Sequence, residues 1–294
     1  MMQVCPEASS TPVDVRRWSG RTRRPSRRLS WQRSLAAVVM SCLVGCFTTS
    51  GVAAPLLPDL FAWESQSRGY MYGGTFALVS EPGRVLYRFN VAIPNVGSGP
   101  FEVYEVTHAD ATQDVYQNIY DSDGGYTQVL MGNFSDVHPT FGHLHLEGLA
   151  RYSLREVVAG DGVGPVVAFQ LKTSHGLVDS VAFDTSLPGA SPTRVYDDVL
   201  ANPLGVSIGW ADLYAKSIPA QRIDVTGVPS GRYWLEVSID PNDIVRESDE
   251  TNNVTRILVD LDIPRVPAPG GFTLLAIASA LLTIWRTRAA GLVH

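Results

Sequence analysis

Three histidines stand within eight residues, His138 to His145, of a segment that reads VHPTFGHLHLEG, although the whole chain has only six. In a strand, residues two apart point to the same face, about 6–7 Å along the chain. His143 and His145 then share a face with Phe141. Imidazole is a ligand that suits both copper and zinc. The spacing therefore predicts a metal site with two histidines and with a phenylalanine in line with them. The alternative is that both histidines only pack or form hydrogen bonds.

The elements that would position these residues are predicted to be strands. Apolar side chains alternate with period two in GRVLYRFNVAIPN (Val85, Tyr87, Phe89, Val91, Ile93) and in GRYWLEVSIDP (Tyr233, Leu235, Val237, Ile239). Gly, Pro, Asn and Asp clusters separate such segments, and no long segment has a helical period, although residues 193–203 are expected to form a short helix. The sequence predicts an all-β fold, an antiparallel β-sandwich with few short helices.

The N-terminal segment, residues 1–54, has the features of an export signal. It holds eight arginines, no lysine and two acids, and its basic part precedes the apolar run SLAAVVMSCLVGC. Cleavage before Ala54 or before Pro55 is one expectation. Acylation of Cys46, in a sequence that resembles a lipoprotein box, is the other. A basic arm with a membrane anchor is the alternative to a signal.

The C-terminal segment, residues 263–294, contains an apolar run of 14 residues, Phe272 to Trp285, closed by Arg286 and Arg288. A stable membrane span needs about 20 residues. The segment resembles the PEP-CTERM sorting tail of Gram-negative bacteria that produce exopolysaccharide, although Ala268 replaces the usual glutamate. The resemblance implies a protein at the cell surface or in the extracellular matrix, with a short apolar helix that associates transiently with the membrane. An ordinary C-terminal anchor is the alternative.

Between the two ends lies a predicted core domain, residues 55–262. All three cysteines fall in the first 54 residues, so no disulfide is expected in the core, which is large enough to be stable without one. Residues 55–267 contain 27 acids and 13 bases, a net charge of 13 − 27 = −14. This acidity disfavours nucleic acid and attracts cations such as amines; it can equally serve only to keep an exported protein soluble.

Several motifs, in order along the chain, resemble the bacterial lysyl oxidase family. HPTFGHLHLEGLARYSLRE resembles its copper-binding segment, His-Pro-x-His-Gly-His-x-His. KTSHGLVDS matches the family's Lys-x-Ser-Phe-Cys-Leu-x-Asp at Lys172, Ser174, Leu177 and Asp179. The sequence from GVSIGWADLYAKS to SDETNNV resembles the C-terminal half of the family, and LPDL and RFNVAIPNVGSGPFEV resemble its start. The resemblance covers nearly all of residues 57–259 and implies a sandwich like that of lysyl oxidase.

The resemblance also implies which residues do chemistry. Lys172 and Tyr214 correspond to the pair that forms the cofactor lysine tyrosylquinone, and Asp212 corresponds to the base that abstracts a proton. Copper(II) would be held by His143 and His145, with Phe141 at the position of a third ligand. Two residues are candidates to replace that ligand: His175, which stands where the family has phenylalanine, and His138.

A second ion is predicted in the loop ESDETNN. Its oxygen donors are of the type that calcium prefers. By resemblance, the ligands are Glu247, Asp249, Asn252 and Asn253, together with Asp59 and the carbonyl of Leu60. A polar hairpin turn without an ion is the alternative.

These features predict an exported copper amine oxidase that acts on a primary amine, either a lysyl side chain or a small amine. The cell envelope or the exopolysaccharide matrix is the expected environment. Phe141 leaves open a catalytically impaired relative that serves as a surface-binding module. A third interpretation, an Ig-like adhesion module of CARDB type, accounts for the segment from Gly231 to Val254 but not for the histidines or for Lys172 and Tyr214.

Overall fold

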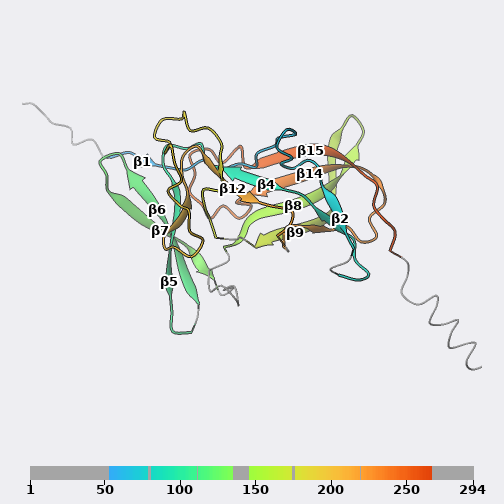
Figure 1. Ribbon diagram of the computed structural model, residues 1–294, viewed down its shortest axis with the longest axis horizontal. Helices are drawn as coiled ribbons and strands as arrows, with labels where there is room; N and C mark the ends of the chain where they lie inside the picture. Colours follow the sequence, from blue (N-terminus) through green and yellow to red (C-terminus); the bar gives the residue numbers. More distant parts are fainter. Residues whose placement is uncertain are drawn as a thin grey trace, which may run out of the picture. The chain divides into compact units, whose positions relative to one another are not determined.

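The computed structural model describes six stretches of the chain (Figure 1): residues 53–78, 81–110, 112–134, 146–173, 176–218 and 220–266. The chain divides into two units, Met1–Ser50 and Gly51–His294, and all of the described residues belong to the second. They form fifteen strands and no helix, so none of these residues belongs to a helix long and apolar enough to cross a membrane. The predicted apolar helix at Phe272 to Trp285 lies outside the described residues, as does nearly all of the export segment.

The strands pair in four sheets, and every pairing between them is antiparallel. One sheet has the order β1 (Pro55–Leu56), β6 (Gln113–Asp121), β5 (Phe101–Thr107) and β11 (Leu204–Val206), with β7 (Tyr126–Phe134) also paired to β6. A four-stranded sheet has the order β15 (Val254–Leu261), β14 (Gly231–Ile239), β8 (Glu147–Val158) and β9 (Gly162–Thr173). The predicted all-β antiparallel class is confirmed.

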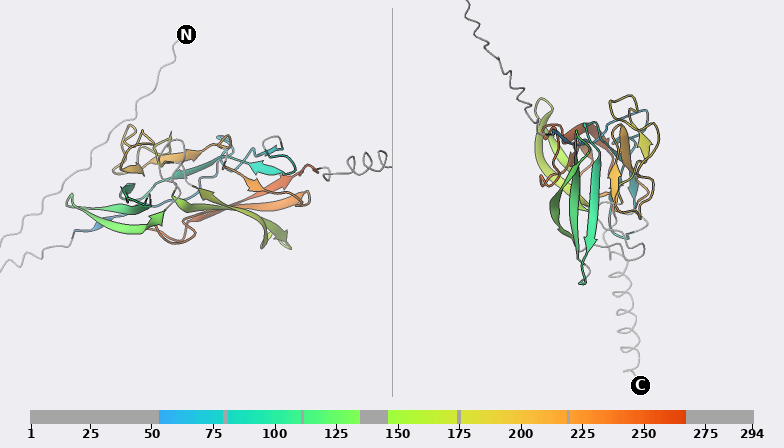
Figure 2. Two further views of the ribbon diagram at one scale, coloured as in Figure 1. Left: turned by 90° about the horizontal axis from the view of Figure 1, so that it is seen from below. Right: turned by 90° about the vertical axis from the view of Figure 1, so that its left-hand side faces the viewer.

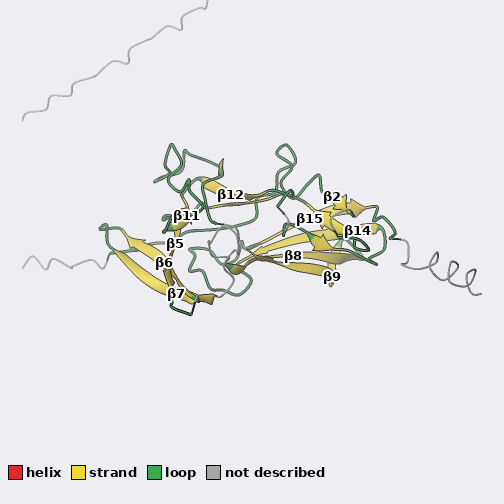
Figure 3. Ribbon diagram, turned by 60° about the horizontal axis from the view of Figure 1, so that its bottom comes forward, coloured by secondary structure: helices red, strands yellow, loops and turns green. Residues whose placement is uncertain are grey.

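Two three-stranded sheets complete the fold. One has the order β10 (Val181–Ala182), β12 (Trp210–Tyr214) and β4 (Val91–Pro94). The other has the order β13 (Ile223–Asp224), β3 (Leu86–Arg88) and β2 (Thr75–Ala77). Figure 3 shows the strands β5, β6 and β7 gathered at one end of this unit and β8, β9, β14 and β15 at the other.

The core lies between layers of strands, which Figure 2 shows one above the other. One apolar cluster joins buried residues of most of the strands, from Leu60 to Ile263. Phe89, between β3 and β4, packs edge-to-face on Tyr152 of β8 across this core, with the ring centroids 5.3 Å apart. Stacked sheets pack about 10 Å apart, which leaves room for interdigitated side chains from both layers. Side chains on the inner faces of β9 and β12 therefore meet in this interior.

The predicted alternation is confirmed in β14, where the four apolar residues from Tyr233 to Ile239 are all buried. The segment from Val85 to Ile93 is buried at the expected positions too, but it is two strands rather than one. The break falls at Asn90, because β3 pairs with β2 and β13 whereas β4 pairs with β12. The side chain of Asn90 accepts a hydrogen bond from the Lys216 amide at 2.8 Å, which holds the chain where it changes sheets.

The short helix predicted at residues 193–203 is wrong, because this segment contains only bends and a turn. Two of its backbone amides donate to a side chain outside the segment. The carboxylate of Asp179 accepts hydrogen bonds from the amides of Val195 and Tyr196, at 2.8 and 3.2 Å. A helix would have needed a regular ladder of amide–carbonyl bonds within the segment. Tertiary hydrogen bonds to a distant carboxylate replace that ladder.

Candidate functional site

The side chains of Lys172 and Tyr214 meet between two sheets. Lys172 lies near the end of β9, where it pairs with Ala150 of β8. Tyr214 ends β12, where it pairs with Val91 of β4. Both residues are 1% exposed, and the Lys172 Nζ lies 4.4 Å from the centroid of the Tyr214 ring. The structure thus brings together the two residues that the resemblance pairs.

β9 has its large apolar residues on the exposed face and a lysine on the buried one. Phe169 and Leu171 are 54% and 49% exposed, whereas Lys172, on the opposite face of the strand, is buried. The Arg151 guanidinium covers the Phe169 ring at 4.7 Å. Removing an ammonium group from water is unfavourable, and burial lowers the pKa of Lys172 to about 8, partly opposed by the negative charge of Asp212. Placing a lysine inside and two large apolar residues outside is typical of a functional position rather than of a structural one.

Asp212 completes this group. It lies two residues before Tyr214 on β12, so both side chains point to the same face. It is 3% exposed, and the Ser180 hydroxyl donates a hydrogen bond to its Oδ1 at 3.1 Å. Burial raises the pKa of Asp212 to about 7, although the Tyr214 and Ser180 hydroxyls and the positive charge of Lys172 act in the opposite direction. A carboxyl group with this pKa can accept or release a proton near neutral pH.

Tyr152 and Gln221 form a wall of the same interior, and neither was found from the sequence. The Tyr152 hydroxyl donates to Gln221 Oε1 at 2.9 Å, and Gln221 Nε2 donates to the Phe89 carbonyl at 3.0 Å. Both residues are fully buried, and burial raises the pKa of Tyr152 far above its usual range. This tyrosine therefore stays neutral and serves as a polar, hydrogen-bonded wall beside Asp212.

The predicted copper ligands His138, His143, His145 and His175 lie outside the described residues, as does Phe141. One described stretch begins at Leu146, just before β8, and ends at Thr173, the last residue of β9. Glu147 is the register partner of Thr173, so these two ends of the described chain lie side by side. Both are therefore close along the sheet to Lys172.

A second cluster joins the loop after β14 to the start of the domain. Glu247 Oε2 accepts a hydrogen bond from the Leu60 amide at 2.6 Å, and Asn252 Nδ2 donates to Asp59 Oδ1 at 2.6 Å. Asn253 Nδ2 donates to Glu247 Oε1 at 3.2 Å. The structure thus brings together five of the six residues predicted to bind calcium.

The sixth residue, Asp249, is exposed and caps its own turn, because its Oδ1 accepts hydrogen bonds from the amide and the hydroxyl of Thr251. Two carboxylates that the sequence did not predict are present instead. Oxygens of Asp240, Glu247 and Glu250 all lie within 4.8 Å of one another. This spacing of like charges, combined with the burial of Asp240 and Glu247, is a geometry that a cation would stabilise.

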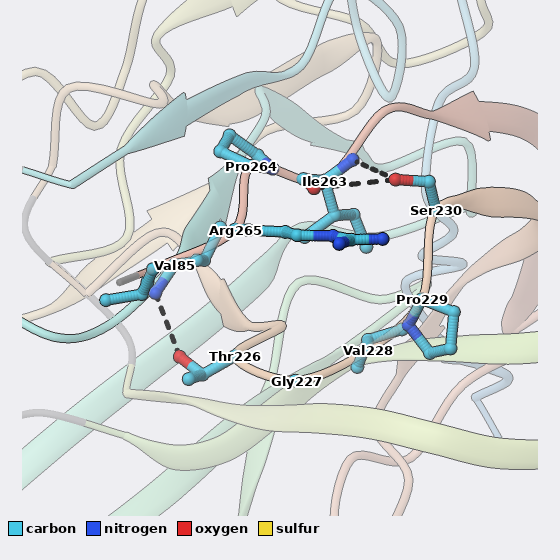
Figure 4. A pocket seen from close by; sticks show the side chains of 10 residues that line it. Val85, Thr226, Gly227, Val228, Pro229, Ser230, Ile263, Pro264 and Arg265 are labelled. Carbon is cyan, nitrogen blue, oxygen red and sulfur yellow. Dashed lines mark hydrogen bonds between the residues drawn. The ribbon is translucent and has the colours of Figure 1, made fainter. Parts of the chain in front are cut away.

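A surface cavity of about 660 Å³ lies between residues 226–230 and residues 263–266 (Figure 4). The Ser230 hydroxyl accepts a hydrogen bond from the Ile263 amide at 3.0 Å, and the Val85 amide donates to the Thr226 hydroxyl at 2.8 Å. Among the described residues, Arg265 is the one charged side chain that lines it. None of the predicted site residues that the structure describes lines this cavity.

Comparison with known proteins bears on the group around Lys172. Residues 138–266 match the lysyl oxidase family model. Protein-lysine 6-oxidase of Rattus norvegicus is 48% identical over 56 residues, which are 19% of this chain and 14% of that protein. The same enzyme of Homo sapiens is 48% identical over 56 residues, 19% of this chain and 13% of that protein. Lysyl oxidase homolog 3A of Danio rerio is 47% identical over 62 residues, 21% of this chain and 8% of that protein.

The chain therefore spans only a small part of the length of these curated relatives. The segment that matches the lysyl oxidase family model contains Lys172, Asp212 and Tyr214 as well as the loop from Glu247 to Asn253, whereas Asp59 and Leu60 precede it. The resemblance to lysyl oxidases is confirmed for this segment. The bacterial origin, the sorting tail and the division into three regions at residues 54 and 262 stay predictions.

Proposed function

We propose that this chain is an exported, copper-dependent amine oxidase of lysyl oxidase type, which converts primary amines to aldehydes. Oxygen and water are consumed in this reaction, and ammonia and hydrogen peroxide are released. The observation that supports it most is the burial of Lys172 with its Nζ over the Tyr214 ring. A lysine and a tyrosine side chain are the precursors of lysine tyrosylquinone. The fold holds Lys172 and Tyr214 together, with Nζ 4.4 Å from the ring centroid, despite the unfavourable burial of the amine.

Lysine tyrosylquinone, once formed, supplies an electrophilic carbonyl that condenses with a primary amine and accepts two electrons. The chain's own contribution is positioning. β9 holds the Lys172 Nζ 4.4 Å from the ring centroid of Tyr214. Because its pKa is lowered to about 8, roughly a tenth of the Lys172 amine is neutral and nucleophilic at pH 7, far more than for an exposed lysine. This geometry and protonation state favour bond formation between Nζ and the oxidised tyrosine ring.

Asp212 is proposed as the base that removes a proton from the carbon beside the substrate nitrogen. It lies on the same face of β12 as Tyr214 and is shielded from water. A buried carboxylate with a pKa near 7 is a stronger base than an exposed one and is still half ionised at neutral pH. The acidic surface of the domain favours the approach of cationic amines.

Copper is proposed to be held by His143 and His145, and bound copper supplies the oxidation of tyrosine that makes the quinone. Phe141 offers no donor atom, so copper is expected to be bound weakly unless His175 or His138 provides a third nitrogen.

Phe141→His is therefore expected to raise the copper content and the quinone yield of the purified protein. Elemental analysis and quinone staining measure the two quantities. If His175 already completes the site, the wild type will carry nearly one copper per chain and His175→Phe will remove it. Equal copper content in all three proteins contradicts the assignment of this segment as the copper site.

Calcium is proposed to bind the cluster around Glu247. The Oδ1 atoms of Asn252 and Asn253 are buried and have no hydrogen-bond partner among the described residues, so they are suited to act as ligands of a cation. Burial raises the pKa of Glu247 to about 8, and the nearby charges of Glu250 and Asp240 add to this effect. An ion would stabilise all of these oxygens and join the loop to the Asp59 segment.

Added calcium is expected to raise the melting temperature by several degrees, since saturation at 100 times Kd contributes about 2.7 kcal/mol. Without calcium, the fold should lose stability as the pH rises from about 4.5 towards 8, because the folded state keeps the Glu247 proton that the unfolded chain releases. Glu247→Gln removes the repulsion between carboxylates, so it should abolish the effect of calcium without lowering the stability of the calcium-free protein. A melting temperature that does not respond to calcium in the wild type contradicts this proposal.

The proposed environment is the cell surface or the exopolysaccharide matrix, reached through the export signal, with transient membrane association through the tail or acylation at Cys46. Mass spectrometry of the secreted and membrane fractions distinguishes these fates, because each produces a different N- or C-terminal peptide.

The proposed function is tested on copper-loaded protein with a panel of small primary amines and a lysyl peptide. Production of hydrogen peroxide measures turnover, and peptide mapping measures the Lys172–Tyr214 cross-link. Turnover together with the cross-link supports the amine oxidase. Full copper occupancy without a cross-link favours a surface-binding relative that has lost the reaction.

A further inference from the structure

Ser180 occupies a fixed position beside the strand that carries Asp212. Its amide donates to the Ala211 carbonyl at 3.0 Å, and its carbonyl accepts a hydrogen bond from Arg194 at 2.8 Å. The next residue, Val181, starts β10 and pairs with Ala211 of β12. The backbone of Ser180 is therefore held against β12 whatever its side chain.

The preceding residue strengthens this placement. Asp179 is 1% exposed, and its carboxylate accepts hydrogen bonds from both the amide and the hydroxyl of Ser207 at 2.8 Å. It also binds the amides of Val195 and Tyr196. Four donors from two distant segments thus fix the chain just before Ser180. A substitution that removes only the Ser180 hydroxyl is expected to leave this framework in place.

The hydroxyl of Ser180 is directed at the side chain of Asp212. It donates to Oδ1 at 3.1 Å, and the Tyr214 hydroxyl acts on the same carboxylate. Ser180 is thus the hydroxyl that reaches this carboxylate from outside β12. The ionisable groups that face Asp212 are Lys172 from β9, Tyr152 from β8 and Tyr214 from β12 itself.

We propose that Ser180 is a positioning residue for Asp212: its hydroxyl fixes the rotation of the carboxylate and stabilises the charged, basic form. This inference rests on the proposed role of Asp212 as the base. The segment from Lys172 to Ser180 then contributes twice to the site, with the amine at its start and with the hydroxyl that orients the base at its end. Hydrogen bonds to a buried carboxylate are strong, so losing the Ser180 hydroxyl is expected to have a measurable effect even though the Tyr214 hydroxyl remains.

The first test uses copper-free protein and therefore does not depend on activity. Carboxyl signals of ¹³C-labelled aspartate are titrated by NMR, with Asp212→Asn to assign the signal of Asp212. Ser180→Ala is expected to raise the titration midpoint of Asp212 by on the order of half to one pH unit, the effect of losing one hydrogen bond to a charged group. Ser180→Thr keeps the hydroxyl and should restore the wild-type midpoint.

Ser186→Ala is the matched control, because it removes a serine hydroxyl that donates to Asp184 at 2.6 Å on the exposed loop after β10. It should leave the Asp212 midpoint unchanged. An unchanged midpoint in Ser180→Ala overturns the inference.

The second test uses quinone-loaded protein. Ser180→Ala should shift the acidic limb of kcat/KM to higher pH by the same amount as the NMR midpoint, with unchanged quinone content and little change in KM. A shifted midpoint with an unshifted acidic limb overturns the positioning role. If the wild type oxidises no amine at all, the proposed function fails by itself, and the NMR midpoint alone then decides whether Ser180 controls Asp212.

Discussion

Tyr214→Phe is expected to abolish both the quinone and amine oxidation while leaving the fold intact. The phenol oxygen is the atom from which oxidation to a quinone begins, and phenylalanine lacks it. The ring of Tyr214 would keep its place in the core, because the substitution removes one atom from a residue that is 1% exposed. Quinone staining and hydrogen peroxide release should both fall to the background level.

Tyr233→Phe serves as the control for this substitution. Tyr233 is also buried, and its hydroxyl donates to the Pro229 carbonyl at 2.7 Å in another part of the domain. This variant should keep its quinone and its activity. Quinone staining that persists in Tyr214→Phe would show that the cofactor is made elsewhere or not made from this residue.

Replacing Lys172 is a second way to distinguish a functional role from a structural one, because its effects on activity and on stability are expected to be opposite. Lys172→Met should also abolish the quinone, but it should increase stability, because methionine occupies a similar volume without a buried amine. Because burial lowers the pKa of Lys172 from 10.5 to about 8, this amine opposes folding below pH 10.5, and the effect is complete below about pH 8. Loss of activity combined with a gain of stability is the signature of a residue retained for function.

The sequence predicted elements well where one face of a strand is buried. In β14, Tyr233, Leu235, Val237 and Ile239 are buried at every second position, as the period predicts. The same period explains why Asp212 and Tyr214 share a face of β12, although only the family resemblance indicated these two residues. The helix predicted at residues 193–203 is absent because amides of this segment bind the carboxylate of Asp179, which lies outside it. Local periodicity contains no information about such a tertiary acceptor.

The site itself could be predicted only in part. Periodicity in β9 would have buried Phe169 and Leu171 and exposed Lys172, the reverse of what the structure contains, and only the family resemblance indicated the lysine. Ser180 and Tyr152 approach Asp212 through pairings between strands far apart in sequence, so no local motif signals them. Functional positions are where local rules are expected to fail, because chemistry there is favoured at the expense of stability.

The acidic cluster near Glu247 illustrates the same limit. The loop composition predicted an ion, but its contact with Asp59 came from resemblance alone. Glu250 and Asp240 were not predicted as neighbours of Glu247, since their approach depends on how the turns at residues 240–253 fold. Asp249, which has the right chemistry, instead caps Thr251. Residue type identifies candidate ligands, whereas turn geometry decides which of them face one another.

Asp212→Asn is expected to lower kcat/KM by about 10²- to 10⁴-fold, the usual contribution of a general base. Asparagine has nearly the same shape, and its Oδ1 can still accept the hydrogen bond from Ser180, so the framework around the site is preserved. The quinone content should stay unchanged, because Lys172 and Tyr214 are intact.

The pH dependence of the wild type gives an independent measure of the same carboxyl group. The base must be ionised to accept a proton, and burial raises the pKa of Asp212 to about 7. The kcat/KM of the wild type should therefore fall as the pH decreases through about 7, rather than near 4 as for an exposed aspartate. The residual activity of Asp212→Asn should lack this acidic limb. An acidic limb that survives in Asp212→Asn at normal quinone content would assign proton abstraction to another group, and the burial of Asp212 beside Lys172 would then serve only to stabilise the charge of the lysine before the quinone forms.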